Sequence, residues 1–150
     1  MDPRDLLITG GVLSGVTCIG LCVFIAIPNF VTMQNRAKRA EAPANLDGIK
    51  TSQLAYEGAF DTYVECATPY PRPVDALDGE LVPWPGGGCF DELGWAPDGD
   101  VRATYWVEVD ADGSSFTAHA MVDLDGDGIP AHFVATPREN TYAVTPPDVF

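Results

Sequence analysis

The chain has 150 residues, of which 22 are acidic and eight are Lys or Arg, so its formal net charge is −14. The negative charge lies late in the chain, because residues 41–150 hold 20 Asp and Glu against four Lys and Arg, a balance of −16. Such a surface repels a phosphate backbone, which excludes a nucleic-acid-binding head, and the length allows one modest core rather than two.

An uncharged stretch, Leu6–Asn35, lies near the start of the chain, and its first part, Leu6–Ile27, is dominated by apolar side chains. As a helix rising about 1.5 Å per residue, that part would be roughly 33 Å long, enough to cross the hydrocarbon core of a bilayer. It is longer than the apolar region of a secretory signal, and no small-residue cleavage site follows it. We therefore expect residues 1–30 to form a retained transmembrane or filament-core helix.

Positive charge follows the apolar stretch rather than preceding it. Three basic residues lie between positions 36 and 39, whereas Arg4 is opposed by Asp2 and Asp5. On the positive-inside rule alone, this bias would place the remainder of the chain in the cytoplasm.

A polar segment continues the helical pattern over residues 31–65. Pro28 interrupts the apolar helix and Pro43 adds a second kink, because proline removes a backbone hydrogen bond. Alternating three- and four-residue steps define one amphipathic face, made of Leu46, Ile49, Gln53, Tyr56, Phe60 and Tyr63. The sequence predicts one long kinked helix, apolar all round in its first half and amphipathic in its second.

An acidic globular head is predicted over residues 66–150. Residues 66–100 are rich in proline and contain a triple glycine, so we expect a long loop there. Apolar and polar residues then alternate within residues 101–145, which predicts antiparallel strands at 102–109, 115–122 and 131–136, with a short fourth near 141–144. A helix packed on such a sheet of three to four strands is an α+β fold.

The four cysteines fall into two pairs. Cys18 and Cys22 lie in the apolar stretch and are interpreted as small apolar side chains. Cys66 and Cys89 suggest one disulfide in an oxidising compartment, which would stabilise the fold by roughly 3 kcal/mol. The alternative is two free buried thiols.

Asp123, Asp125 and Asp127 alternate with Leu and Gly in a pattern that matches the first half of a calcium loop, to which the Ile129 carbonyl would add a ligand. The second half is missing, because Val134 occupies the position of the usual bidentate glutamate. The alternative is a polar turn between two strands. Apart from calcium here, we expect no cofactor.

His119 and His132 lie on neighbouring predicted strands and lack cysteine or carboxylate neighbours at metal-ligand spacing, so we expect them to pack against each other across the sheet. The sequence contains no nucleophile elbow, phosphate loop or paired metal motif. We therefore predict that the protein is not an enzyme.

The exit from the apolar stretch carries an Ala-Ile-Pro-x-Phe block, a Gln-x-Arg-Ala-Lys block, Glu-Ala and Asn-Leu, in that order. In this chain these are Ala26, Ile27, Pro28, Phe30, Gln34, Arg36, Ala37, Lys38, Glu41, Ala42, Asn45 and Leu46. This order resembles type IV pilins, and later segments such as CFDELGWAPDGDVRATYWV also look like the heads of some bacterial pilins.

The resemblance implies a single-pass protein of the bacterial inner membrane with a periplasmic head, which becomes part of a cell-surface filament when it assembles. The implied partners are copies of itself or other pilins, contacted through the N-terminal helix, and the inner membrane before assembly. This orientation reverses the positive-inside expectation, because short basic stretches after the apolar helix are ordinary in this family.

Filament packing and the helix kink are expected at Gly11, Gly15, Pro28 and Phe30. The glycines would let neighbouring helices approach closely. Pilins carry a glutamate at the position of Gly11, and this chain also lacks their Phe-Thr-Leu-Ile-Glu processing block. Two hypotheses follow, a pilin-like subunit of a surface or secretion filament, or a non-assembling, membrane-anchored periplasmic binding or accessory module with a pilin-like fold.

Overall fold

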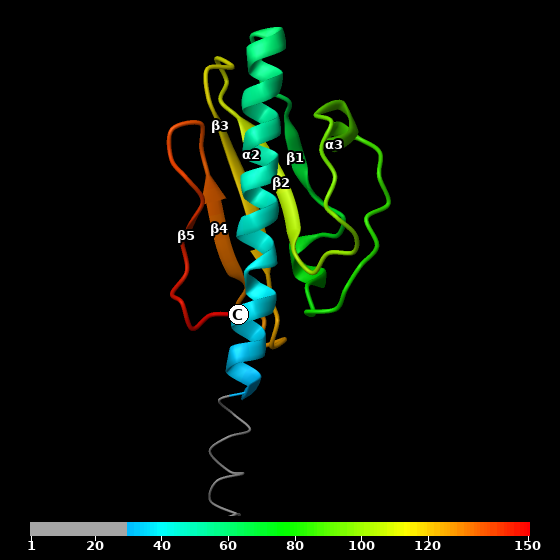
Figure 1. The fold of residues 1–150 in the computed structure, drawn as a ribbon, viewed down its shortest axis with the longest axis vertical. Helices are drawn as coiled ribbons and strands as arrows, with labels where there is room; N and C mark the ends of the chain where they lie inside the picture. The colour runs from blue at the N-terminus through cyan, green and yellow to red at the C-terminus, as the bar shows by residue number, and fades with distance from the viewer. Residues whose placement is uncertain (1–29) are drawn as a thin grey trace, which may run out of the picture. The chain divides into compact units, whose positions relative to one another are not determined.

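The computed structural model describes residues 30–150. The chain divides into two units, residues 1–34 and 35–150, and we call the second the sheet domain. In the sheet domain, helix α2 (Glu41–Phe60) packs on one face of a five-stranded antiparallel sheet, in which the strands are arranged in chain order (Figure 1). The strands are β1 (Cys66–Tyr70), β2 (Thr104–Val109), β3 (Phe116–Val122), β4 (Ala131–Ala135) and β5 (Tyr142–Ala143).

The helical segment is interrupted once within the described residues. Residues 30–39 are helical, Ala40 is a turn residue, and α2 begins at Glu41. Pro43 has no N–H to donate to the carbonyl four residues earlier, whereas the Ala44 N–H does reach the Ala40 carbonyl at 3.3 Å. The kink predicted at Pro43 is thus matched only roughly, because the helix is interrupted at Ala40, three residues before the proline. Pro28 lies outside the described residues.

The amphipathic face of α2 packs on β3 and β4. Leu46, Ile49 and Gln53 are fully buried, as the three- and four-residue spacing predicts. The expected continuation of this face to Phe60 is wrong, because Phe60 is 64% exposed. The helix ends there because Asp61 adopts a left-handed conformation and donates its N–H to the Glu57 carbonyl at 2.8 Å.

Gln53 resolves the one polar interruption of the buried face. Its side-chain amide donates to the Val64 carbonyl at 2.7 Å, and its side-chain oxygen accepts the Val64 N–H at 3.0 Å. Both backbone groups of Val64 are therefore satisfied away from water just before β1 begins. A buried glutamine here joins the helix to the entry of the sheet.

The segment predicted as a long loop, residues 66–100, contains regular structure, which corrects that expectation. It holds β1, a 3-10 turn η1 (Val74–Ala76) and a short helix α3 (Cys89–Glu92). Proline hides β1 from a sequence pattern, but β1 is an edge strand, where a residue without an N–H is tolerated. The sheet therefore has five strands instead of the expected three to four.

Among residues 30–150, no helix is long and apolar enough to cross a membrane. The predicted span, Leu6–Ile27, lies outside these residues, as do Gly11 and Gly15.

Candidate functional site

The first described helical residues expose large apolar side chains. Phe30 is 63% exposed, Met33 is 69% exposed, and Val31 is also exposed. Exposed apolar groups gathered on one short segment mark an interaction surface more often than a solvated one. Phe30 is thus accessible for packing, which is what its predicted role requires.

The disulfide predicted between Cys66 and Cys89 is present, so the alternative of two free thiols is wrong. It joins the first residue of β1 to the first residue of α3, with Cα atoms 5.6 Å apart and a sequence separation of 23. It closes most of the proline-rich segment into a braced loop.

A cluster of aromatic rings fills the space beneath this braced loop. Trp84 contacts Tyr70, Phe90 and Trp95 with ring centroids 4.8, 5.5 and 5.3 Å apart. Trp95 in turn contacts Tyr105 of β2 at 5.7 Å, and burial raises the pKa of the Tyr105 hydroxyl. The braced loop is therefore packed onto the sheet rather than hanging free.

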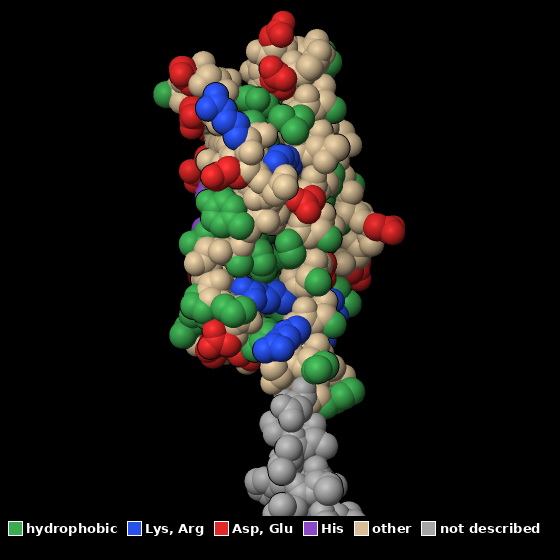
Figure 2. Space-filling view, turned by 60° about the vertical axis from the view of Figure 1, so that its left-hand side comes forward, with side chains coloured by type: hydrophobic (Ala, Val, Ile, Leu, Met, Phe, Trp, Pro, Cys, Tyr) green, Lys and Arg blue, Asp and Glu red, His purple; other side chains and the backbone are tan. Residues whose placement is uncertain are grey.

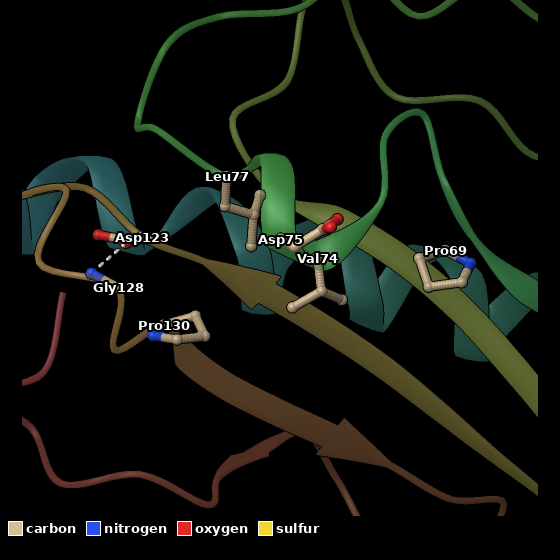
Figure 3. A pocket seen from close by; sticks show the side chains of 7 residues that line it. All are labelled: Pro69, Val74, Asp75, Leu77, Asp123, Gly128 and Pro130. Carbon is tan, nitrogen blue, oxygen red and sulfur yellow. Dashed lines mark hydrogen bonds between the residues drawn. The ribbon is translucent and has the colours of Figure 1, made fainter.

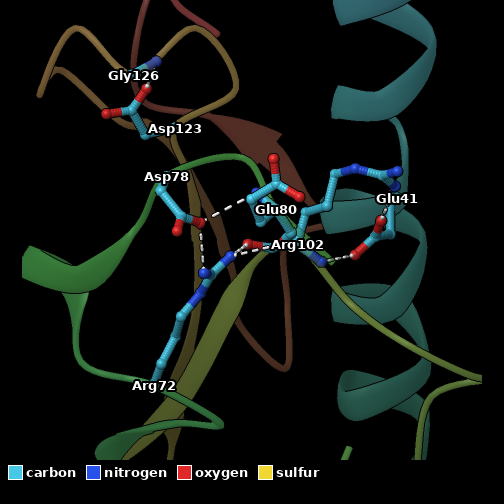
Figure 4. A network of polar contacts seen from close by, with 7 residues as sticks. All are labelled: Glu41, Arg72, Asp78, Glu80, Arg102, Asp123 and Gly126. Atoms are coloured by element: carbon cyan, nitrogen blue, oxygen red, sulfur yellow. Dashed lines mark hydrogen bonds and ion pairs between the residues drawn. The ribbon is translucent and has the colours of Figure 1, made fainter. Parts of the chain in front are cut away.

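Two arginines hold the other side of the loop (Figure 4). Arg72 pairs with Asp78 at 2.6 Å and donates to the carbonyls of Glu80 and Arg102 at 2.8 and 2.9 Å. Glu41 at the start of α2 accepts the Arg102 N–H at 2.7 Å and pairs with the Arg102 guanidinium at 3.3 Å. These contacts fix the positions of both guanidinium groups within the sheet domain.

The predicted calcium residues do come together, in a turn that we call the carboxylate turn (residues 123–129). Ligand oxygens of Asp123, Asp125 and Asp127 all lie within 4.8 Å of one another. Both oxygens of the buried Asp123 already accept backbone N–H groups, from Gly126 at 2.7 Å and Gly128 at 2.9 Å.

The remaining carboxylates of this turn differ in their contacts. Asp127 accepts the Ile129 N–H at 2.8 Å, and the Ile129 side chain is exposed. The exposed Asp125 accepts no hydrogen bond from any described residue. The turn is therefore held by its own backbone bonds, and these carboxylates are the described residues that could hold a cation.

A cavity of about 510 Å³ lies beside the carboxylate turn (Figure 3). Its walls are mainly apolar, with two carboxylates, and are made of Pro69, Val74, Asp75, Leu77, Asp123, Gly128 and Pro130. The Asp123 carboxylate is engaged with the Gly128 N–H, as Figure 3 shows. The cavity offers apolar contact but no arrangement of a nucleophile and a base.

The two histidines form a pair on the sheet face opposite α2. Nδ1 of His119 and Nε2 of His132 are 3.1 Å apart. Their ring centroids are 5.3 Å apart and their planes differ by 23°, so the rings are nearly parallel, and one ring nitrogen can donate its N–H to the other. The indole of Trp106 stacks on His119 with centroids 4.6 Å apart. The predicted cross-strand packing is confirmed.

Burial lowers the pKa of both imidazoles. For His119, loss of hydration is opposed by the negative charge of Glu108, and for His132 the neighbouring His119 lowers the pKa further. Nε2 of His119 is buried without a hydrogen-bond partner in the described part of the chain, so a proton there would be poorly solvated. The pair is built to stay neutral.

On the face that Figure 2 shows, acidic side chains are spread out rather than gathered in one patch. Residues 30–150 hold 20 Asp and Glu against seven Lys and Arg. Together with the braced loop and the helix on the sheet, this surface defines an acidic, disulfide-stabilised α+β domain that follows an apolar segment in the sequence.

The chain is similar to the type IV major pilin protein PilA of Myxococcus xanthus strain DK1622, with 28% identity over 115 residues. The match covers 77% of this chain and 42% of that protein, so the chain spans less than half the length of its relative. The resemblance to pilins is confirmed, and the protein is type IV pilin-like. No protein-family model matches the chain, and no solved structure matches it.

Proposed function

We propose that this protein is a structural, non-enzymatic subunit of a bacterial type IV filament. The observation that carries the proposal is the similarity to a major pilin over 77% of the chain. The exposed Phe30, Val31 and Met33 support it, because a filament core would cover such side chains. Copies of this chain or other pilins are the proposed partners.

Assembly is proposed to run through the apolar N-terminal helix. Before assembly, Leu6–Ile27 would hold the protein in the inner membrane with the sheet domain in the periplasm, where the Cys66–Cys89 bond can form. Gly11 and Gly15 would then allow close helix contacts within the filament.

A second candidate is a membrane-anchored periplasmic module that does not assemble. Gly11 favours it, because a pilin-like chain with no carboxylate at this position lacks the charge that would pair with a neighbouring subunit in the filament core. The two candidates differ in one observable, the presence of filaments containing this chain.

Electron microscopy and immunoblotting of the material sheared from cells separate the two candidates. We expect filaments in cells that carry the gene, none in a deletion strain, and a return on complementation. Phe30→Asp should reduce the sheared protein at least about tenfold, whereas Leu81→Asp, which changes an exposed apolar residue elsewhere, should not. Protein that stays entirely in the membrane fraction of wild-type cells would favour the non-assembling module.

Calcium at the carboxylate turn remains a proposal of its own. The proposal is supported by the close approach of the Asp123, Asp125 and Asp127 carboxylates. The hydrogen bonds from backbone N–H groups to Asp123 already hold the turn, so the turn does not need calcium to form. Thermal unfolding of the full chain in detergent, with calcium or with a chelator, tests it. A raised midpoint that Asp125→Asn abolishes would support a bound ion, and an unchanged midpoint would leave a polar turn.

A further inference from the structure

The two ends of the sheet domain carry different uncommitted charges. Strand β2 begins opposite the end of β3, since Thr104 pairs with Met121, so the carboxylate turn lies at the end where α2 starts (Figure 1). The β2–β3 turn and the β4–β5 loop lie at the other end, where α2 finishes. The seven residues of β3 separate the two ends by roughly 20 Å.

At the end where α2 finishes is an open polar cavity of about 530 Å³, which we call the distal cleft. Hydroxyl groups and one guanidinium line it, from Tyr63, Ser114, Ser115, Thr136 and Arg138, with the carboxylate of Asp110 also in the lining. Hydroxyl and guanidinium groups are the donors that a carboxylate accepts from.

Arg138 is an uncommitted cation in the cleft. Within residues 30–150 the ion pairs are Arg72–Asp78 and Arg102–Glu41, and Arg138 makes no hydrogen bond to a described residue. Arg39 and Lys50, by contrast, donate to backbone carbonyls of the segment that follows β4. An exposed arginine with no hydrogen bond or ion pair among the described residues is available to an acidic group from outside the chain.

The matching acidic group is present on the same protein. The carboxylate turn connects β3 to β4, and its Asp125 carboxylate is exposed and accepts no hydrogen bond from the described residues. It lies at the opposite end from Arg138, so one copy cannot bring the two together. A second copy can, by placing its carboxylate turn at the distal cleft of the first.

We propose that the distal cleft of one copy binds the carboxylate turn of the next, with Arg138 pairing with Asp125. The contact joins two different surfaces, and such heterologous contacts build open filaments when the rotation between copies does not close a ring. It therefore rests on the proposed filament function and adds to it a specific contact between sheet domains. Asp110 opposes the incoming carboxylate and limits the strength of the contact.

Cysteine cross-linking tests the contact directly. Ser115→Cys and Ile129→Cys, which leave Arg138 and Asp125 in place, are combined in a full-length chain whose Cys18 and Cys22 are changed to Ala, and filaments are sheared from cells and oxidised. Because the two new thiols lie at opposite ends of one sheet domain, they can join only different copies. We expect a ladder of cross-linked multimers, and a matched chain with Ser115→Cys and Asp98→Cys should give none.

Charge reversal supplies an independent measurement. Arg138→Glu should reduce sheared filaments at least about tenfold, the combination with Asp125→Arg should restore them, and Asp110→Asn should increase them. Formation of the native disulfide in the membrane fraction checks that each variant folds. Wild-type filaments that give no ladder, with Arg138→Glu at the wild-type yield, would overturn this contact alone, whereas a wild type without filaments would overturn the proposed function.

Discussion

At the scale of single residues, the histidine pair makes stability depend on pH. Both folded-state pKa values lie below the ordinary 6.5, so folding favours the neutral imidazoles. The contribution of His119 and His132 is therefore complete above about pH 6.5 and is lost as the pH falls toward their folded pKa values. Glu108 moderates the loss by favouring a charged His119.

Thermal unfolding of the full chain at pH 7.5, 6.5 and 5.5 measures this effect. The unfolding midpoint of the native protein should fall as the pH is lowered from 7.5 to 5.5. The midpoint of the double variant His119→Asn, His132→Asn should fall by less over the same range, whatever its value at pH 7.5. Equal slopes for the two proteins would show that the pair carries no linked protonation.

The candidate residues were predictable where chemistry is local in sequence. Asp123, Asp125 and Asp127 come together because they occupy alternate positions of one tight turn, which brings their carboxylates close to one another. A Cys66–Cys89 bond could be expected because residues 66–150 contain two cysteines. Arg138 and the hydroxyl groups of the distal cleft could not be predicted. They come from α2's exit, the β2–β3 turn and the β4–β5 loop, and only the folded sheet gathers those segments.

At the scale of elements, a buried amide ties α2 to Val64, in the segment that leads into β1. Gln53→Leu would leave the N–H and the carbonyl of Val64 unpaired in the core, so we expect a loss of at least about 2 kcal/mol in the free energy of unfolding. Leu54→Gln changes the neighbouring exposed position and should stay within about 0.5 kcal/mol. Chemical denaturation compares the two variants, and equal losses would contradict a specific role for Gln53.

The disulfide should stabilise the braced loop as a unit. Replacing Cys66 and Cys89 by Ala should lower the free energy of unfolding by roughly 3 kcal/mol, because the unfolded chain regains the freedom of the closed loop. Replacing Cys18 and Cys22 by Ala is the matched control and should leave the unfolding of the sheet domain unchanged. A protein that loses nothing without the Cys66–Cys89 bond would show that the aromatic cluster alone holds the loop.

Helices and strands could be predicted from the sequence where the alternation of apolar and polar residues is regular, and not where proline or a helix end interrupts it. In β3 the burial alternates along the strand because one face meets α2, whereas β2 and β4 are buried on both faces over most of their length. Strand β1 was missed because its side chains do not alternate and it contains Pro69, which an edge strand tolerates. Phe60 has the helical spacing of the buried face, which predicts burial, but it is the last residue of α2 and its side chain is exposed.

At the scale of the whole molecule, charge opposes association. Residues 30–150 carry a formal balance of −13, so neighbouring sheet domains in a filament repel one another. Salt screens this repulsion, since the Debye length shrinks from about 30 Å at 0.01 M to about 10 Å at 0.1 M. Salt also weakens a contact such as Arg138 with Asp125, but that contact is short-ranged, whereas the repulsion sums over many pairs of charges.

We therefore expect sheared filaments to shorten or dissociate when dialysed from about 0.15 M to about 0.01 M salt, as followed by sedimentation and electron microscopy. Asp98→Asn with Asp100→Asn removes two exposed negative charges outside the distal cleft and the carboxylate turn, so it should protect filaments at low salt. The opposite result, filaments that persist at low salt and come apart as salt rises, would mean that attractive ion pairs between copies outweigh the repulsion of the acidic sheet domains.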